Sequence, residues 1–390
     1  MPRPALEVAG LLRTLVQQGR LLTLSSAQAK VVRALIACRT AALGGHVDVC
    51  DACGHEAVSY NSCRNRHCPK CQGGATAAWL EAQQQNLLPV PYAHVVFTLP
   101  DLLAPLALQN PRVVYGLLFR AVSQTLLQVA ATPRHLGARI GFLAVLHTWG
   151  QNLLHHPHVH CVVPAGGVAL DGSRWLRCRP GFFLPVRVLS RLYRGKLLAF
   201  LEQAHQAGSL QFHGRLAELR NPSAFRGLLA RARALEWVVY AKPPFGGPDA
   251  VLKYLARYTH RVAISNHRLV EATDEHVRFR WKDYRHGHRQ RVMTLETTEF
   301  VRRFLLHLLP HRFVKIRYYG FLAQSQRATA LAGCHELLAA LYLAGAETSD
   351  SSPDAPTEPE TPQPPEAPVC PNCERGRLRY DRPLPPPDSS

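Results

Sequence analysis

The sequence predicts an α+β protein in which a helical, cysteine-rich N-terminal module precedes a domain built around a largely antiparallel sheet. Stretches with helical apolar periodicity alternate in mixed order with short β-rich apolar runs, which is typical of α+β domains. Cys-x-x-Cys pairs also gather before residue 72. With 390 residues, 47% of them hydrophobic, the chain is long enough for two or three domains.

Helical periodicity in the N-terminal module is interrupted once. One helical face carries Leu11, Leu12, Leu15 and Val16, and a second carries Val31, Val32, Leu35 and Ile36. Helical periodicity is then lost over 44–71, where Cys, His and Gly become frequent, and it returns from about residue 73. The expected elements are two helices within 3–40, an irregular segment at 44–71 and a helix at 73–88.

Apolar β-rich runs such as YAHVVFTLP and IGFLAVLHTWG predict the strands of the following domain. Longer stretches of helical periodicity separate these runs. The expected elements, in order, are a strand at 92–100, helices within 101–130, strands at 140–150 and 158–166, helices within 188–235, a short strand at 237–241, a helix at 249–259 and strands within 262–296.

The charge of the chain is strongly positive and uneven. The net charge is +19, and the residues before 328 include 42 basic and 17 acidic side chains, a net of +25. Such a field favours a polyanionic partner, which indicates nucleic acid. No apolar run is long enough for a membrane span, and the N-terminus does not resemble a signal peptide. We therefore expect no membrane partner and a bacterial cytoplasmic location with the nucleoid.

Two Cys-x-x-Cys pairs predict a zinc ribbon. Cys50 and Cys53 form the first pair, Cys68 and Cys71 form the second, and 14 residues lie between the two pairs. Each pair can form a tight knuckle that directs two thiolates toward one ion. Gly54 suits the turn after the first pair because it tolerates positive φ. The sequence thus predicts one structural Zn²⁺ bound by these four cysteines.

The loop before the second pair carries further candidate ligands and several cations. Cys63 and His67 lie close enough in sequence to be alternative zinc ligands. Arg64, Arg66 and Lys70 bring positive charge to the same loop, and we expect them to contact a DNA backbone.

The run HHPHVHCVV predicts a second metal site. His158 and His160 flank Val159, and side chains two apart on a strand share one face. Both imidazoles can therefore bind one ion while Val159 packs into the core. A two-histidine site needs a third ligand. Gln151 is the expected third ligand, because a hairpin would bring it alongside, and His147 is the alternative.

A segment with helical periodicity places two tyrosines one turn apart. Tyr254 and Tyr258 share one face of the expected helix, and Arg257 and Arg261 each follow a tyrosine by three residues. Such pairs are commonly packing pairs. A phenol has a pKa near 10 and needs activation to act as a nucleophile at neutral pH. A cation on the scissile phosphate supplies that activation, so these tyrosines are candidate nucleophiles.

Basic and aromatic side chains alternate in HVRFRWKDYRHGHRQR, residues 276–291. Cations can hold phosphates while aromatic rings stack on unpaired bases. We expect a DNA-contacting hairpin; the alternative is a solvated hairpin whose aromatic side chains lie in the core. The expected contacts are Arg278, Arg280, Trp281 and Arg285, with Phe279 and Tyr284 as further aromatic side chains.

These motifs occur in an order that resembles the IS91 family of transposases, which belong to the HUH endonuclease superfamily. The cysteine module is followed by FTLP on a first strand, HPHVH on a later strand and YLARYTHR on a helix. The resemblance covers about residues 30–325. It implies an HUH-type domain with a central antiparallel sheet and a tyrosine-bearing helix, placed after a helical and zinc-ribbon module.

The resemblance also implies a reaction. Tyr254 and Tyr258 would be nucleophiles in a rolling-circle-like transposition that nicks and rejoins single-stranded DNA through 5′-phosphotyrosine intermediates. His158 and His160 would bind Mg²⁺ or Mn²⁺, with Gln151 at the position of a polar third ligand. The partners would be single-stranded element ends and a target DNA; the sequence indicates no oligomeric state.

Domain boundaries follow from composition together with this resemblance. Residues 346–369 are rich in Pro and acidic side chains, which predicts a disordered linker. Cys370 and Cys373 then form a single knuckle with only two ligands. The expected domains are a helical and zinc-binding domain at 1–88, an HUH catalytic domain at 89–325, a helix at 326–345, the linker at 346–369 and a tail at 370–390.

Two other functions are compatible with parts of the sequence. A replication initiator or relaxase would share the chemistry but often carries a helicase domain, and the sequence contains no GxxxxGK[ST] motif. A zinc-ribbon DNA-binding protein without catalysis would need neither the histidine strand nor the tyrosine pair.

Overall fold

The computed structural model describes residues 6–21, 23–84, 86–245, 247, 250–251, 262–283, 287, 289–346 and 367–387. The chain divides into two compact units. We call them the cysteine-rich unit (Met1–Ala75, Ile264–Val301 and Asp350–Ser390) and the sheet unit (Thr76–Ala263 and Arg302–Ser349). Both are discontinuous in sequence, and their limits differ from the boundaries expected at 88 and 325.

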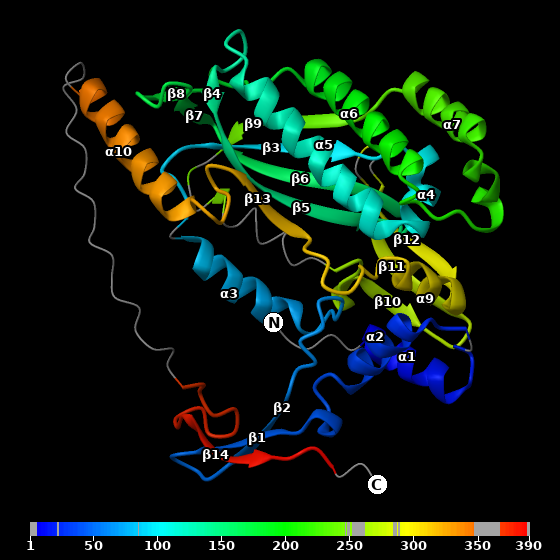
Figure 1. Ribbon diagram of the computed structural model, residues 1–390. Helices are drawn as coiled ribbons and strands as arrows, with labels where there is room; N and C mark the ends of the chain where they lie inside the picture. Colours follow the sequence, from blue (N-terminus) through cyan, green and yellow to red (C-terminus); the bar gives the residue numbers. More distant parts are fainter. Residues whose placement is uncertain are drawn as a thin grey trace. The chain divides into compact units, whose positions relative to one another are not determined.

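The sheet unit is built on a five-stranded antiparallel sheet (Figure 1). Neighbouring strands follow the order β13-β5-β6-β3-β9. Their bounds are β13 Ile316–Gly320, β5 Gly141–Trp149, β6 His155–Pro164, β3 Tyr92–Thr98 and β9 Val239–Phe245. The expected strands at 92–100, 140–150 and 158–166 are therefore three adjacent strands, and the α+β fold class with an antiparallel sheet is confirmed.

One face of this sheet packs on long helices. Phe97, Leu146 and Val159 are fully or almost fully buried on it, because alternate residues of paired strands share a face. The helices α5 and α6 cover them (Figure 1). Helices of this layer are α4 Ala104–Gln109, α5 Pro111–Ala131, α6 Val186–Gln206 and α7 Pro222–Ala234, with short 3-10 turns at Asp101–Leu103 and Gly214–Arg220.

By length and hydropathy α5 could span a membrane, yet 61% of its apolar stretch is buried inside the protein. Val114, Leu118 and Val122 of this helix belong to the same core as the sheet. Its apolar character is thus explained by a position in the core of the unit.

The opposite face of the sheet has a separate core near one end. Leu143, Val145 and Val162 pack there with residues of α3 (Gln72–Gln84) and α10 (Arg327–Ala346). A small three-stranded sheet consists of β4 Ala138–Arg139, β7 Gly166–Ala169 and β8 Trp175–Arg177. In sequence, β4 directly precedes β5, and β7 directly follows β6. The other end of this face carries histidines instead of apolar side chains.

The cysteine-rich unit contains two three-stranded antiparallel sheets. Its first helix is amphipathic, and its second begins with a capping box in which Ser25 and Gln28 satisfy each other's backbone N–H groups. The elements are α1 Val8–Gln17, α2 Ser26–Ala37, a 3-10 turn at Ala41–Leu43, β1 Gly45–Cys50, β2 Glu56–Tyr60 and β14 Leu378–Leu384, then a 3-10 turn at Asn266–Arg268, β10 Leu269–Ala272, β11 His276–Asp283 and β12 Arg289–Glu296. Helix α9 (Thr297–Leu305) ends the middle segment of this unit and begins the last segment of the sheet unit.

Polar contacts join the N-terminal helix to the middle segment within the cysteine-rich unit. The backbone N–H of Val8 donates to Asn266 at 3.1 Å. Gln18 and Arg20 both donate to Asp274, at 2.8 and 2.6 Å. These contacts explain why residues 264–301 group with the N-terminal segment. The expected linker falls mostly on residues outside the described part of the chain, and so does most of the expected helix at 249–259.

Candidate metal centres

Three histidines on adjacent strands of the central sheet form one cluster. Ring nitrogens of His147, His158 and His160 all lie within 4.8 Å of one another. The ring centroids of His147 and His160 are 4.5 Å apart, and those of His158 and His160 are 4.8 Å apart. His147 and His160 are buried, while His158 is partly exposed. Solvent can therefore reach the cluster from the side of His158.

Strand register brings these side chains together. His147 of β5 pairs with His158 of β6, and Val145 pairs with His160. Since alternate residues face the same side, all three imidazoles lie on the face opposite the α5 and α6 layer. Val159, between the two β6 histidines, points into that layer and is fully buried. Along β6, His158 and His160 thus share one face of the sheet and Val159 lies on the other.

Hydrogen bonds determine which nitrogen atom of each β6 imidazole is available. The Nδ1 of His158 lies 2.7 Å from the backbone oxygen of His156, so Nδ1 donates and the lone pair is on Nε2. The Nδ1 of His160 lies 2.9 Å from Nε2 of His94. If His160 donates there, the lone pair of its ring is on Nε2. This arrangement suits imidazoles that bind a metal ion through Nε2.

His94 was not among the expected site residues. It lies on β3, and its ring stacks beside that of His160 with centroids 5.1 Å apart and planes 8° apart. Burial, helped by the positive charge of Lys242 and by His158, lowers the pKa of His94 to about 3. A neutral His94 can accept a hydrogen bond from His160 Nδ1. The signal in the sequence is its place two residues before Val96 in YAHVVFTLP, which puts it on the face of β3 that carries Val96, the residue opposite His160.

The turn between β5 and β6 is held by a buried histidine. His307 donates from Nε2 to the backbone oxygen of Leu153 at 3.0 Å, and its Nδ1 lies 3.3 Å from the Thr148 hydroxyl. Leu153 is fully buried with a φ of 61°, a backbone conformation that a branched side chain rarely adopts. Arg303 also donates to the backbone oxygen of Asn152 at 3.2 Å. These contacts fix the hairpin that carries His147 and His158.

His307 makes the stability of this hairpin dependent on pH. Burial lowers the pKa of His307 to about 4, below the ordinary value near 6.5, so between these values the unfolded chain binds more protons than the folded chain. Stability is therefore full above pH 7 and is lost as pH falls toward 4. We expect wild type to lose about 2 kcal/mol more between pH 7.5 and pH 5 than His307→Gln, which cannot titrate.

Urea denaturation of the two proteins at both pH values measures this difference. His213→Gln serves as a control because His213 is exposed, and its pH dependence should equal that of wild type. Equal slopes for wild type and His307→Gln would contradict the role of His307.

The structure supplies His147 as the third member of the histidine cluster, which was the alternative to Gln151. Gln151, the expected third ligand, lies in the turn that follows β5, and its role as a ligand stays a prediction. The strand pairing shifts register between His147 and Trp149. Because of this shift, spacing in the sequence cannot choose between His147 and Gln151 as the third ligand. The nucleophile candidates Tyr254 and Tyr258 lie outside the described residues, as do Arg257, Arg261 and Arg285.

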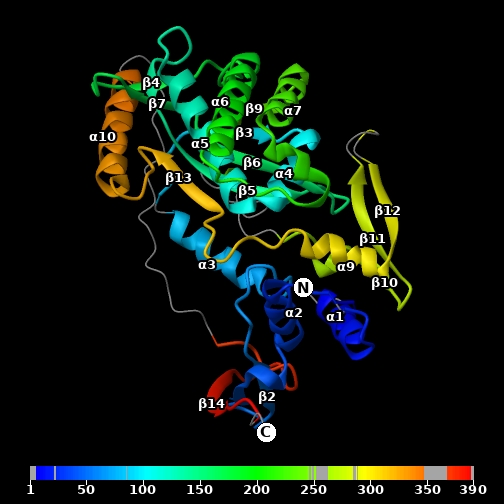
Figure 2. The same ribbon diagram turned by 45° about the vertical axis from the view of Figure 1, so that its right-hand side comes forward.

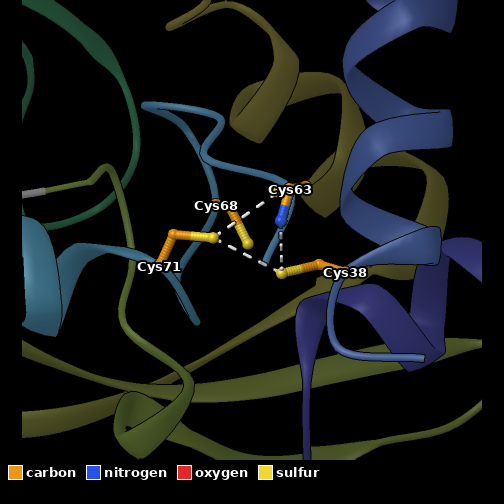
Figure 3. A group of neighbouring side chains, drawn as sticks. All are labelled: Cys38, Cys63, Cys68 and Cys71. Carbon is orange, nitrogen blue, oxygen red and sulfur yellow. Dashed lines mark hydrogen bonds between the residues drawn. The ribbon is translucent and has the colours of Figure 1, made fainter. Parts of the chain in front are cut away.

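Four cysteines form a second cluster, in the cysteine-rich unit (Figure 3). Cys38 follows α2, and Cys63, Cys68 and Cys71 come from the loop after β2. The sulfur of Cys71 lies 3.4 Å from that of Cys38 and 3.6 Å from that of Cys63. A tetrahedral zinc site with Zn–S bonds of about 2.3 Å has sulfur atoms about 3.8 Å apart, whereas a disulfide needs about 2.05 Å. The geometry therefore fits a metal site.

Burial makes a cation necessary if these cysteines are to be thiolates. It raises the pKa of Cys38 to about 12, and the pKa of Cys68 rises well above its ordinary value through its hydrogen bond with Cys63 and burial. Without a cation both groups are therefore neutral thiols. A coordinated Zn²⁺ reverses this preference, because a coordinating thiol loses its proton.

The expected zinc ligand set, Cys50, Cys53, Cys68 and Cys71, is corrected by this grouping. Cys68 and Cys71 join Cys38 and Cys63, whereas Cys50 and Cys53 belong to a different cluster. The reason is the hairpin between the pairs. Cys50 lies at its turn, and the five residues of β2 carry the chain to its opposite end, about 17 Å away at the usual rise of a strand. Cys63, an alternative ligand, belongs to the site; His67 is not in the cluster, and Cys38 was missed.

The cations of the cysteine loop differ in availability. Lys70 forms an ion pair with Glu7 at 2.6 Å and donates to the backbone oxygen of Cys38 at 3.2 Å, so it contributes to the fold of the module. Burial lowers the pKa of Arg66. Arg64 is exposed and has a φ of 49°. Among the three, Arg64 is thus the most exposed cation.

Strands β11 and β12 pair antiparallel, as expected for a hairpin over 276–291 (Figure 2), while Tyr284 lies outside the described residues. The aromatic side chains of the hairpin are not all available for stacking. Phe279 is fully buried and packs on Phe300 with centroids 5.7 Å apart, so the alternative of a core aromatic holds at this position. Trp281 is partly exposed. Arg278 and Arg280 are exposed on the opposite face of the strand, with Arg278 paired to Glu271 at 2.9 Å.

Comparison with known proteins agrees with this architecture. Residues 12–99 match the transposase zinc-binding domain family, and residues 141–329 match the family described as "Putative transposase". The chain is 59% identical over 350 residues to "Putative transposase y4qJ" of Sinorhizobium fredii, covering 89% of this chain and 88% of the relative. The chain belongs to the IS91-type transposases. The residues of the transposase that match the first family include all four cysteines of the Cys38 cluster and the whole β1–β2 hairpin.

A second relative of this transposase is named for its insertion sequence element. The chain is 31% identical over 299 residues to the transposase for insertion sequence element IS801 of Pseudomonas savastanoi pv. phaseolicola, covering 76% of this chain and 70% of the relative. Among solved structures, the conjugative relaxase TrwC in complex with OriT DNA shares 17% identity and a TM-score of 0.24, over 42% of this chain and 70% of the relaxase.

Proposed function

We propose that this transposase nicks and rejoins single-stranded DNA at the ends of an insertion element through 5′-phosphotyrosine intermediates. The observation that carries the proposal is the histidine cluster on the central sheet, in a chain of transposase family. Its three imidazoles offer a metal site on a face where no helix of the α5 and α6 layer lies. Burial of two imidazoles there costs free energy that hydrogen bonds or a bound metal ion must offset.

The donor set fits a divalent metal ion. His147, His158 and His160 supply three nitrogen atoms, which leaves coordination positions for substrate oxygen atoms. When bound, a divalent ion polarises the scissile phosphate and stabilises its developing charge. Mg²⁺ and Mn²⁺ are the ions we propose. Imidazole ligands favour softer metals than Mg²⁺, so a weak site that prefers Mn²⁺ is expected.

Tyr254 and Tyr258 are the proposed nucleophiles. A deprotonated phenol oxygen attacks the phosphorus atom, its bond to phosphorus forms, and the bond from phosphorus to the 3′ oxygen breaks. The phenol proton leaves to a base, and the 3′ oxygen takes up a proton to become a 3′-OH. The ester energy is retained, so attack by a 3′-OH on the phosphotyrosine rejoins a strand without ATP. A second tyrosine can hold a second strand end meanwhile.

The charge of the chain supports a DNA partner. The residues before 328 have a net charge of +25, and Arg278, Arg280 and Arg64 are exposed. Binding that depends on phosphate contacts weakens steeply with salt. Relationship to two transposases favours this function over a replication initiator or a relaxase, and the histidine cluster favours it over a non-catalytic zinc protein.

A labelled single-stranded oligonucleotide carrying an element end tests the proposal. With Mn²⁺ present, the reaction should give a covalent protein–DNA adduct that survives SDS denaturation. The adduct should contain a label placed at the 3′ end of the strand, and a label placed at the 5′ end should be released with the other fragment. Retention of the 5′ label would indicate the opposite polarity, and the absence of any adduct across such ends would overturn the proposal.

His94 is expected to control the metal affinity of this site. Replacement of His94 with Leu removes the acceptor for His160 Nδ1 and should weaken Mn²⁺ binding by 10–100-fold, the usual effect of losing a partner of a ligating histidine. His94→Gln retains an acceptor and should recover part of the affinity. Calorimetric titration with Mn²⁺ measures both. Equal affinities for wild type and His94→Leu would contradict an orienting role.

A further inference from the structure

Cysteines from both ends of the chain meet in a third cluster, within the cysteine-rich unit. Cys50 and Cys53 follow β1, and Cys370 and Cys373 precede β14. Their sulfur atoms all lie within 4.8 Å of one another. Cys50 and Cys373 are 3.7 Å apart, and so are Cys53 and Cys370, although 317 positions separate the latter two in sequence. A sequence search for local spacing cannot find this site.

The sulfur distances point to a metal ion rather than to disulfides. Both 3.7 Å separations are close to the value of about 3.8 Å for sulfur atoms at the corners of a tetrahedral zinc site. They are far from the bond length of about 2.05 Å in a disulfide. With four cysteines and no acidic side chain in the group, the donor set is one that Zn²⁺ prefers.

The two cysteine pairs have the same local backbone. In the first, Gly54 N–H donates to the backbone oxygen of Cys50 at 3.1 Å, and in the second Glu374 N–H donates to that of Cys370 at 2.9 Å. Gly54 has a φ of 68° and Glu374 a φ of 56°. A glutamate in this conformation is uncommon. The two pairs are therefore matching knuckles, each shaped as half of one site.

Backbone N–H groups already point at the sulfur atoms. The N–H of Ala52 donates to Cys50 Sγ at 3.4 Å, and the N–H of Gly376 donates to Cys373 Sγ at 3.4 Å. Such donors stabilise thiolates. A Cβ atom at Gly376 would collide with Cys50 Sγ and Ala52, so the close approach of the two knuckles requires glycine there.

The surrounding sheet joins the same two chain segments. β14 pairs with β1 in antiparallel register, from Gly45 opposite Leu384 to Cys50 opposite Leu378. Asp51 accepts from the backbone N–H of Arg377 at 2.8 Å and from Arg379 Nε at 3.0 Å. Both hydrogen bonds lower the pKa of Asp51, so its carboxylate remains charged beside the knuckle.

We propose that Cys50, Cys53, Cys370 and Cys373 bind a second structural Zn²⁺, which fastens the C-terminal segment to the N-terminal module. Binding converts four thiols to thiolates and releases up to four protons, and no oxidation takes place. The site is independent of the histidine cluster and of the Cys38 cluster. It completes the ribbon that the sequence predicted from Cys50 and Cys53, with a partner from the other end of the chain.

Zinc content of the full chain tests the proposal. Measurement in a His158→Ala, His160→Ala background excludes metal at the histidine cluster, and it should give two Zn²⁺ per chain. Adding Cys370→Ser and Cys373→Ser should leave one. Adding Cys63→Ser and Cys68→Ser instead should also leave one, and all four serines should leave none. Cys178→Ser, outside the clusters, is the matched control and should retain two. Two Zn²⁺ in the C-terminal variant would overturn the proposal.

A second measurement does not depend on how stable the variants are. A protease recognition sequence inserted within 351–366 of the otherwise wild-type chain allows the C-terminal segment to be cut away under native conditions. The cleaved segment should co-elute with the rest of the protein and dissociate when a chelator removes zinc. Retention of the segment after complete removal of zinc would show that β1–β14 pairing alone holds it, and would overturn the fastening role.

Discussion

A transposase in which Tyr254 and Tyr258 are both phenylalanine is expected to form no covalent adduct with a single-stranded element end. The change removes one oxygen atom from each ring and leaves its apolar part, so folding and DNA binding should persist. Loss of the nucleophile should lower the rate of cleavage by at least roughly 10⁴-fold. The measurement is the SDS-resistant, 3′-labelled adduct described above, together with DNA affinity by fluorescence anisotropy.

The single variants separate the work of the two tyrosines. If one phenol attacks first and the other accepts the second strand, one single variant should lose adduct formation and the other should retain it but fail to complete strand transfer. Tyr60→Phe is the matched control, because Tyr60 is an exposed residue of β2 in the cysteine-rich unit. An adduct in the double variant would assign the nucleophile to another residue.

Removing the histidine cluster should have the second largest effect. His158→Ala combined with His160→Ala deletes two of three nitrogen donors and is expected to slow metal-dependent nicking by roughly 10³-fold or more. The reason is that a bound cation stabilises the charge that develops in the transition state by several kcal/mol. Affinity for single-stranded DNA should change little. Single-turnover rates at saturating Mn²⁺ and parallel anisotropy titrations measure the two quantities separately.

The third ligand can be identified in the same assay. His147→Ala should resemble the double variant, since His147 completes the cluster, whereas Gln151→Ala should retain most of the rate. His311→Ala is the control for loss of an exposed histidine. A large loss with Gln151→Ala and none with His147→Ala would restore Gln151 as the ligand. Nicking that persists without both β6 histidines would place the metal elsewhere.

Much of the sheet and half of the histidine site could be predicted from the sequence. The β6 pattern is decisive because strand periodicity is strictly two, so His158 and His160 must share a face while Val159 is buried. The choice between His147 and Gln151 depends on hairpin register. That register is set by Leu153 in a left-handed conformation and by His307, which is 154 positions away. Neither contact leaves a local signal.

The cysteines show the same limit more plainly. A knuckle after β1 was predicted correctly from Cys50, Cys53 and Gly54, because its geometry is local. The expected partner pair, Cys68 and Cys71, is wrong, because it rests on nearness in sequence alone. Hairpin length keeps Cys68 at the opposite end of β2, and the cysteines that do approach come from 370 and 373. His94 likewise becomes significant only when β3 is paired with β6.

The third cysteine cluster has a consequence for synthesis of the protein. Ribosomes add about 5–20 residues per second. Since Cys370 comes 317 positions after Cys53, it is synthesised roughly 15–60 s after the knuckle of Cys50 and Cys53. A chain cut short by a frameshift or an early stop never completes this zinc site. Such a chain would lack two of the four proposed ligands and would leave Cys50 and Cys53 as an open thiol pair.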